Sequence, residues 1–176
     1  MNLKWDYQLK VGERSNPAVY YEYITMPAGI PKPMDEQIAQ VFGATTGKES
    51  SRLQTWGRTK DTSGKDILTN DPHYIAVLNG TPLHYDPKYP RYSYHLKIRV
   101  DSGQSVRGMD KDELALHRGV FYILDTHSPH QVLAKKKPSW NVAISLDSHE
   151  LIHPHEVLPA LIEYGLSANF VTGEVD

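Results

Sequence analysis

The sequence contains no cysteine among its 176 residues. Without thiols the chain cannot form a disulfide, a thiolate zinc site, an iron–sulfur cluster or a cysteine nucleophile. The same absence leaves the redox compartment undetermined. Histidine, present 9 times, and carboxylate side chains are the only usual metal ligands that remain.

The chain also lacks an excess of charge of one sign and any long apolar run. Its 19 basic and 21 acidic residues give a net charge of −2, which creates no overall field that attracts nucleic acid or an anionic membrane. The residues after Met1, Asn2-Leu3-Lys4-Trp5-Asp6, have neither the basic lead nor the apolar run of a secretion signal. We therefore expect a soluble, cytoplasmic protein with no membrane partner, and nucleic acid is a disfavoured partner.

The length predicts one domain spanning residues 1–176, because two domains would each approach the size at which a lone core becomes marginal. No internal repeat, low-complexity tract or linker divides the chain. The 11 tyrosines, 3 tryptophans, 12 glycines and 12 prolines are spread through short apolar runs that end at turn residues. This texture is typical of a strand-rich domain.

Alternating apolar residues and turn residues predict the strands, and helical spacing predicts two helices. Asn79-Gly80 suits a type I′ turn and predicts a hairpin between its flanking strands. The strand that begins at Arg91 alternates apolar and polar residues. We expect its even-numbered side chains, from Tyr92 to Val100, to pack in the core, and its odd-numbered side chains to face water or a polar interior. Predicted strands cover 19–26, 53–56, 74–78, 83–86, 91–100, 119–125, 131–134 and 140–146; helices cover 34–42 and the residues after 154, with an apolar stripe of Val157, Leu158, Leu161, Ile162 and Leu166.

Two candidate metal ligands lie two residues apart in His84-Tyr85-Asp86. Residues i and i+2 of a strand point to the same side, so this imidazole and this carboxylate can share one metal ion. Taken alone, the triplet suits a surface histidine and a turn carboxylate before Pro87 equally well. His130, 44 residues after Asp86, supplies a third ligand at the turn that opens a new strand. Two histidines and one carboxylate on one face of a metal form the facial triad of non-haem Fe(II) oxygenases.

His127 competes with His130 for the third position, because both flank the same turn. We favour His130, since it begins the run Gln131-Val132-Leu133 and a strand would hold it rigidly. His127 precedes Ser128-Pro129 and is expected to be a loop histidine with a local hydrogen bond.

The order and spacing of these residues resemble the double-stranded β-helix oxygenases that use Fe(II) and 2-oxoglutarate, including the aspartyl/asparaginyl β-hydroxylase-like branch. The triplet 84–86 matches the HxD motif of that family. Residues 119–125 with 129–132 resemble its strand, turn and distal histidine, and 140–147 resembles its closing strand. The resemblance covers about residues 74–148 and none of the first 70. It implies a mainly β, jelly-roll or cupin-like barrel over 74–148 with a few flanking helices.

Many members of that family carry an arginine shortly after the distal histidine that holds the 2-oxoglutarate tail, but this chain has Asn141 in that region. Other branches place a basic residue on the strand after HxD, where His95, Lys97 and Arg99 occupy alternate positions. We expect Arg99 to be the anchor, because a guanidinium makes two parallel charge-assisted bonds to a carboxylate. Lys97 is the next candidate, and His95 resembles a histidine of the β-hydroxylase-like branch that approaches the cosubstrate. A solvated strand face would suit the same three positions, and Asn141 is expected to bond the cosubstrate or to pack.

The resemblance implies an Fe(II)- and 2-oxoglutarate-dependent dioxygenase in which His84, Asp86 and His130 hold the iron. Its expected substrate is an amino acid, a peptide side chain or another small metabolite, with dioxygen as co-reactant. If no basic group reaches the site, a cupin-type metalloenzyme that does not use 2-oxoglutarate becomes the better interpretation. A non-catalytic β-barrel binding module is the third alternative.

Two further segments carry weaker signals. The polar stretch Thr45–Asn70 is a candidate substrate-facing loop, because long loops in compact domains are often functional. His153-Pro154-His155 has two possible ligands, yet the proline and the following helix favour a capping role over metal binding.

Overall fold

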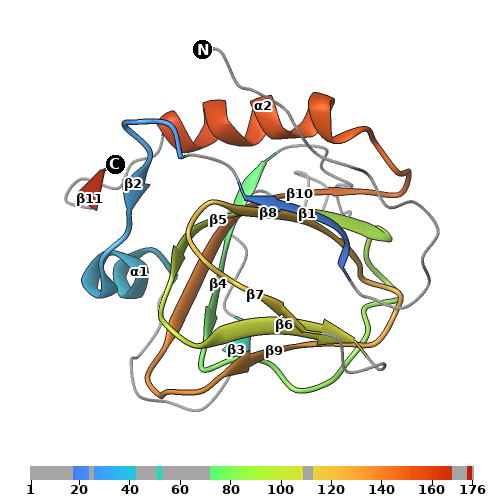
Figure 1. The fold of residues 1–176 in the computed structure, drawn as a ribbon, viewed down its shortest axis with the longest axis horizontal. Coiled ribbons are helices and arrows are strands. Elements are labelled where there is room, and N and C mark those ends of the chain that lie inside the picture. Colours follow the sequence, from blue (N-terminus) through green and yellow to red (C-terminus); the bar gives the residue numbers. More distant parts are fainter. Residues whose placement is uncertain are drawn as a thin grey trace, which may run out of the picture.

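The computed structural model describes residues 18–23, 26–42, 51–52, 72–108, 113–167 and 174–175. Within these ranges the protein is mainly β, with two helices (Figure 1). No helix in these ranges is long and apolar enough to cross a membrane. The proposed loop 45–70 and the expected strand 53–56 lie outside the described residues, apart from two residues at 51–52.

Most strands belong to two antiparallel sheets. The large sheet has the order β1-β8-β5-β10-β4-β3, and the small sheet has the order β7-β6-β9. The large-sheet strands are β1 (Ala18–Tyr23), β8 (Val120–Asp125), β5 (Tyr92–Val100), β10 (Trp140–Ser148), β4 (His73–Leu78) and β3 (Ser51–Arg52). The small-sheet strands are β7 (Glu113–Ala115), β6 (Gln104–Gly108) and β9 (His130–Ala134), and a separate pair joins β2 (Pro31–Lys32) to β11 (Glu174–Val175).

Helix α2 (Pro154–Leu166) covers one face of the large sheet, which we call the outer face (Figure 1). Proline at the first helical position is favourable, because its missing N–H would lack an intrahelical acceptor there. The predicted apolar stripe of this helix is confirmed: its four members from Val157 to Ile162 are at most 2% exposed, although Leu166 is 40% exposed. They pack on Tyr94, Leu96 and Ile98 of β5 and on the even-numbered residues of β10. The shorter predicted helix is α1 (Asp35–Phe42).

The opposite, inner face of the large sheet faces the small sheet. Val120, Tyr122 and Leu124 of β8 form a second apolar cluster with Val106 of β6 and Val132 of β9. Successive strand residues alternate between faces, so β5 directs Ser93, His95 and Lys97 to this inner side, and β10 directs Asn141, Ala143, Ser145 and Asp147 there. The two sheets thus enclose a core that is apolar toward β8 and polar along β5 and β10.

A bulge near the end of β5 breaks its alternation. Ala143 of β10 pairs with Lys97. The residue before it, Val142, pairs with Arg99 instead of Ile98. A one-residue shift of register reverses the face of every later side chain. Arg99 consequently shares the outer face with Val142, and Val100 joins the inner apolar cluster. The expectation that Arg99 lies on the same face as Lys97 is therefore wrong.

The hairpin predicted at Asn79-Gly80 is also wrong, although both residues have the positive φ values that a type I′ turn requires, 63° and 78°. The chain does not fold back onto β4. Instead it leaves the large sheet and crosses to the small one, where Thr81 donates to Val132 O and His84 bridges to His130. β10, which is distant in sequence, takes the place beside β4.

Candidate metal centre

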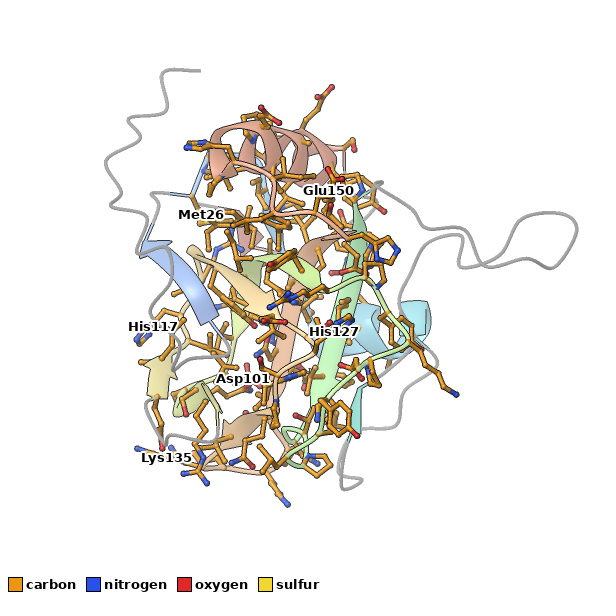
Figure 2. All side chains as sticks on the ribbon, turned by 90° about the vertical axis from the view of Figure 1, so that its right-hand side faces the viewer. Met26, Asp101, His117, His127, Lys135 and Glu150 are labelled. Carbon is orange, nitrogen blue, oxygen red and sulfur yellow. The ribbon has the colours of Figure 1, made fainter. Side chains whose placement is uncertain are left out.

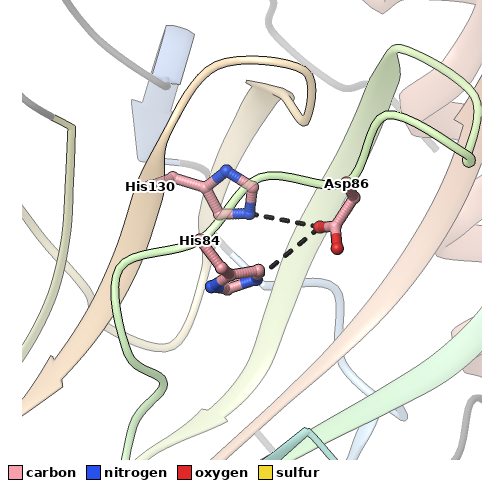
Figure 3. A group of neighbouring side chains, drawn as sticks. All are labelled: His84, Asp86 and His130. Carbon is pink, nitrogen blue, oxygen red and sulfur yellow. Dashed lines mark ion pairs between the residues drawn. The ribbon is translucent and has the colours of Figure 1, made fainter.

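His84, Asp86 and His130 converge at one point (Figure 3), with one ligand atom from each lying within 4.8 Å of the others. Asp86 Oδ2 is 3.6 Å from His84 Nε2 and 3.4 Å from His130 Nε2. The two imidazole rings are tilted, with centroids 4.5 Å apart. Within the described part of the chain, this is the group of histidine and carboxylate side chains arranged to hold a metal ion.

Backbone hydrogen bonds bring the three ligands together from two distant segments. His84 and His130 exchange two bonds, N–H to O, at 3.0 and 2.8 Å. Asp86 N–H donates to Thr126 O at 2.8 Å, and the Thr126 hydroxyl donates to Pro90 O at 2.9 Å. The ligand triplet is thus held directly to the turn that precedes His130.

A backbone carbonyl holds the second ring nitrogen of each histidine. His84 Nδ1 lies 2.6 Å from Pro82 O, and His130 Nδ1 lies 2.7 Å from Ser128 O. A carbonyl oxygen only accepts, so both Nδ1 atoms carry a proton and both Nε2 atoms face Asp86. This is the arrangement by which proteins orient metal-binding imidazoles, so the donor set fits a divalent transition metal.

His127 lies outside this group. Its Nε2 is 2.9 Å from Tyr89 O, and its backbone N–H donates to Asp125 Oδ1. It is a loop histidine with local hydrogen bonds, and the structure brings His130 rather than His127 to the other two ligands.

The metal group lies at one end of the inner face. His130 shares its face of β9 with Val132, which packs in the inner cluster. Thr126, which follows β8, donates its backbone N–H to the carbonyl oxygen of Arg91, just before β5 begins. We call this the metal end of the large sheet: the start of β5, the end of β8 and the end of β10 meet there.

Two of the predicted cosubstrate residues, His95 and Lys97, lie on the inner face. His95 Nδ1 is 2.8 Å from Ser145 Oγ, and its ring stacks on Tyr122 at 5.0 Å between centroids. Lys97 is 4% exposed, and its Nζ lies 5.3 Å from the centre of the Tyr122 ring. Tyr122 pairs with His95, which lies one row nearer the metal end than Lys97. The contact with Tyr122 therefore means that the Lys97 side chain extends toward the metal end.

Lys97 is a buried cation without a matching anion among the described residues. Desolvation lowers its pKa from 10.5 to about 7, because burial penalises the charged form. Asn141, 1% exposed on the neighbouring strand, has both amide atoms buried without a hydrogen-bond partner in the described residues. Lys97 and Asn141 both lie on the inner face, where an ammonium and an amide can each contact a carboxylate.

Arg99, the expected anchor, makes its contacts away from the inner face. Its guanidinium pairs with Asp101 at 3.1 Å and with Asp35 at 2.5 Å, and it donates to Pro33 O at 2.9 Å. These contacts tie the start of α1 to the bulged end of β5. The sequence pattern could not reveal this, because the bulge becomes visible only when the pairing of β5 with β10 is known.

The comparisons with known proteins give no family for this chain, since no protein-family model and no curated protein matches its sequence.

Proposed function

We propose that this protein is an Fe(II)- and 2-oxoglutarate-dependent oxygenase. The observation that carries the proposal is the combination of a His-Asp-His metal group, at one end of the core between the two sheets, with a buried lysine and a buried asparagine on the inner face of the large sheet. A metal group alone would suit many enzymes. The added cationic and amide groups supply what a dicarboxylate cosubstrate needs at its far end.

The strand order supports a double-stranded β-helix for the fold. From β4 onward the chain alternates between the sheets: β4 is in the large sheet, His84 bridges to the small one, β5 returns, and β6 and β7 lie in the small sheet. β8, β9 and β10 continue the alternation. The metal group falls where the chain crosses between sheets, and its three ligands lie at one end of the enclosed core.

The metal group and its hydrogen-bond partners would have separate roles. His84, Asp86 and His130 would hold the iron through two imidazole nitrogens and one carboxylate oxygen. Bound there, Fe(II) supplies the chemistry that couples oxidative decarboxylation of 2-oxoglutarate to hydroxylation of a second substrate by dioxygen. The Nδ1 hydrogen bonds keep both imidazoles in the metal-binding tautomer.

Lys97 takes the anchoring role that the sequence pattern favoured for Arg99. Its ammonium would pair with the distal carboxylate of 2-oxoglutarate, and Asn141 would donate a hydrogen bond to the same group. Forming these contacts in a buried place restores partners to both side chains. His95, held by Ser145 and Tyr122, lies between Lys97 and the metal end and would contact the cosubstrate from the side.

A titration of 2-oxoglutarate into the Mn(II)-loaded protein tests the proposal. Lys97→Met keeps the length of the side chain and removes the charge, so we expect it to weaken 2-oxoglutarate binding by roughly tenfold or more while Mn(II) binding is retained. Lys135→Met, at an exposed position, is the matched control and should bind as the wild type does. Mn(II) binding without any 2-oxoglutarate binding in the wild type would reject the oxygenase and favour a cupin-type metalloenzyme.

A further inference from the structure

A second polar cluster lies on the inner face at the metal end of the large sheet. It consists of Ser93 on β5, Asp147 on β10 and His73 on β4. Ser93 is opposite Asp147 in the register, and its hydroxyl donates to Asp147 Oδ1 at 2.6 Å. His73 Nε2 lies 3.8 Å from Asp147 Oδ2, beyond hydrogen-bond distance. No local sequence pattern links these residues, because they come from three separate strands.

Asp147 lacks a permanent cationic partner. Its side chain is 22% exposed, and no lysine or arginine of the described residues forms an ion pair with it. Asp125, at the same end of the sheet, is held by the Arg91 guanidinium through contacts of 3.1 to 3.3 Å. Burying most of a carboxylate without such a partner is unfavourable, because the charge loses its hydration. Natural folds retain unfavourable features of this kind mainly at functional sites.

Asp147 lies at the metal end of the large sheet, on its inner face. It lies on the same inner face as Lys97 and His95, two rows nearer the metal end than Ala143, which pairs with Lys97. Ser93 fixes one carboxylate oxygen, and the other oxygen keeps lone pairs that no described group uses at hydrogen-bond distance. A cationic group arriving at the metal would find this oxygen already oriented.

We propose that Asp147, oriented by the Ser93 hydroxyl, binds a positively charged group of the substrate, which is therefore an amine- or guanidinium-bearing compound. A carboxylate-rich substrate would be repelled at this position. The assignment rests on the proposed function for the reaction that follows binding, but the binding itself does not depend on 2-oxoglutarate.

The test is direct binding of L-arginine and L-lysine to the Mn(II)-loaded full chain, measured by calorimetry or ligand-observed NMR. L-citrulline, which has nearly the shape of arginine and an uncharged side chain, is the matched probe. We expect arginine or lysine to bind at least about tenfold more tightly than citrulline, and Asp147→Asn to remove that preference. Glu150→Gln changes the net charge equally at an exposed site and should leave the preference intact.

Equal binding of the charged and neutral probes, or an unchanged preference in Asp147→Asn, would overturn this assignment. If Asp147→Asn fails to fold by circular dichroism, Ser93→Ala replaces it and should reduce the preference several-fold. If the wild type does not bind 2-oxoglutarate but still prefers arginine to citrulline, the oxygenase proposal is rejected and the assignment of Asp147 as a cation-binding residue is retained.

Discussion

The buried ammonium of Lys97 gives the free protein a specific pH dependence. In the unfolded chain this lysine keeps its proton up to a pKa of 10.5, whereas in the folded protein it loses the proton at about 7. Between these values the unfolded state binds more protons, so the free energy of unfolding rises with pH by up to about 1.4 kcal/mol per unit from this one group. Below pH 7 both states are protonated, and the full cost of burying the charge, on the order of 4 to 5 kcal/mol, is present.

Lys97→Met removes that contribution. Urea unfolding of metal-free protein at pH 6 and at pH 9 should show the variant to be more stable than the wild type at pH 6, with the advantage greatly reduced at pH 9. The replacement is nearly isosteric, so packing changes are small beside the electrostatic one. Lys135→Met again provides the control for a generic loss of positive charge.

The same group links cosubstrate binding to a proton. A carboxylate beside Lys97 raises its pKa, so binding of 2-oxoglutarate at pH 8.5 should take up about one proton and weaken nearly tenfold per unit above pH 7. Calorimetry in two buffers of different ionisation enthalpy measures this uptake. Binding of 2-oxoglutarate at pH 8.5 with no proton uptake would refute the role of Lys97 as anchor.

Three other predictions follow from the contacts described. Asp86→Ala should abolish measurable Mn(II) binding by electron paramagnetic resonance while leaving the circular dichroism spectrum unchanged, because its backbone N–H still bonds to Thr126. Arg99→Ala should destabilise the protein by about 1 to 3 kcal/mol in urea unfolding through loss of its charged hydrogen bonds, with a retained 2-oxoglutarate affinity as the decisive second measurement. Gly80→Ala should lower both the melting temperature and the affinity for Mn(II), because φ is 78° and a Cβ would lie 2.5 Å from Val132 O; an unaffected melting temperature would contradict this.

Much of the secondary structure could be predicted from the sequence, because its signals are local. The alternation from Tyr92 to Ile98 and the stripe from Val157 to Ile162 each follow from the period of one element. β6 and β7 were not predicted. β6 carries one buried hydrophobic residue, Val106, among polar neighbours, and its pairing with β9 depends on contacts that no local window contains.

The candidate site divides in the same way. His84, Asp86 and His130 could be predicted because the triplet has a fixed spacing and the third ligand follows a recognisable turn. Whether Lys97 and Arg99 lie on the same face of β5 depends on one bulge, which puts Arg99 on the outer face. The order of residue types along the strand does not reveal this bulge. Asp147 and His73 belong together only through the order of strands, which alternation along a single strand does not encode.

The paired backbone bonds between His84 and His130 have a consequence for assembly. Because the two histidines are 46 positions apart in the sequence, the unfolded chain does not hold them together, and closing that loop costs conformational entropy on folding. Metal binding therefore depends on the folded chain, in which the two histidines are adjacent. Removing the metal with a chelator should increase amide exchange in residues 81–86 more than in the strands that α2 covers. Amide exchange along this crossing would report whether the protein holds a metal ion.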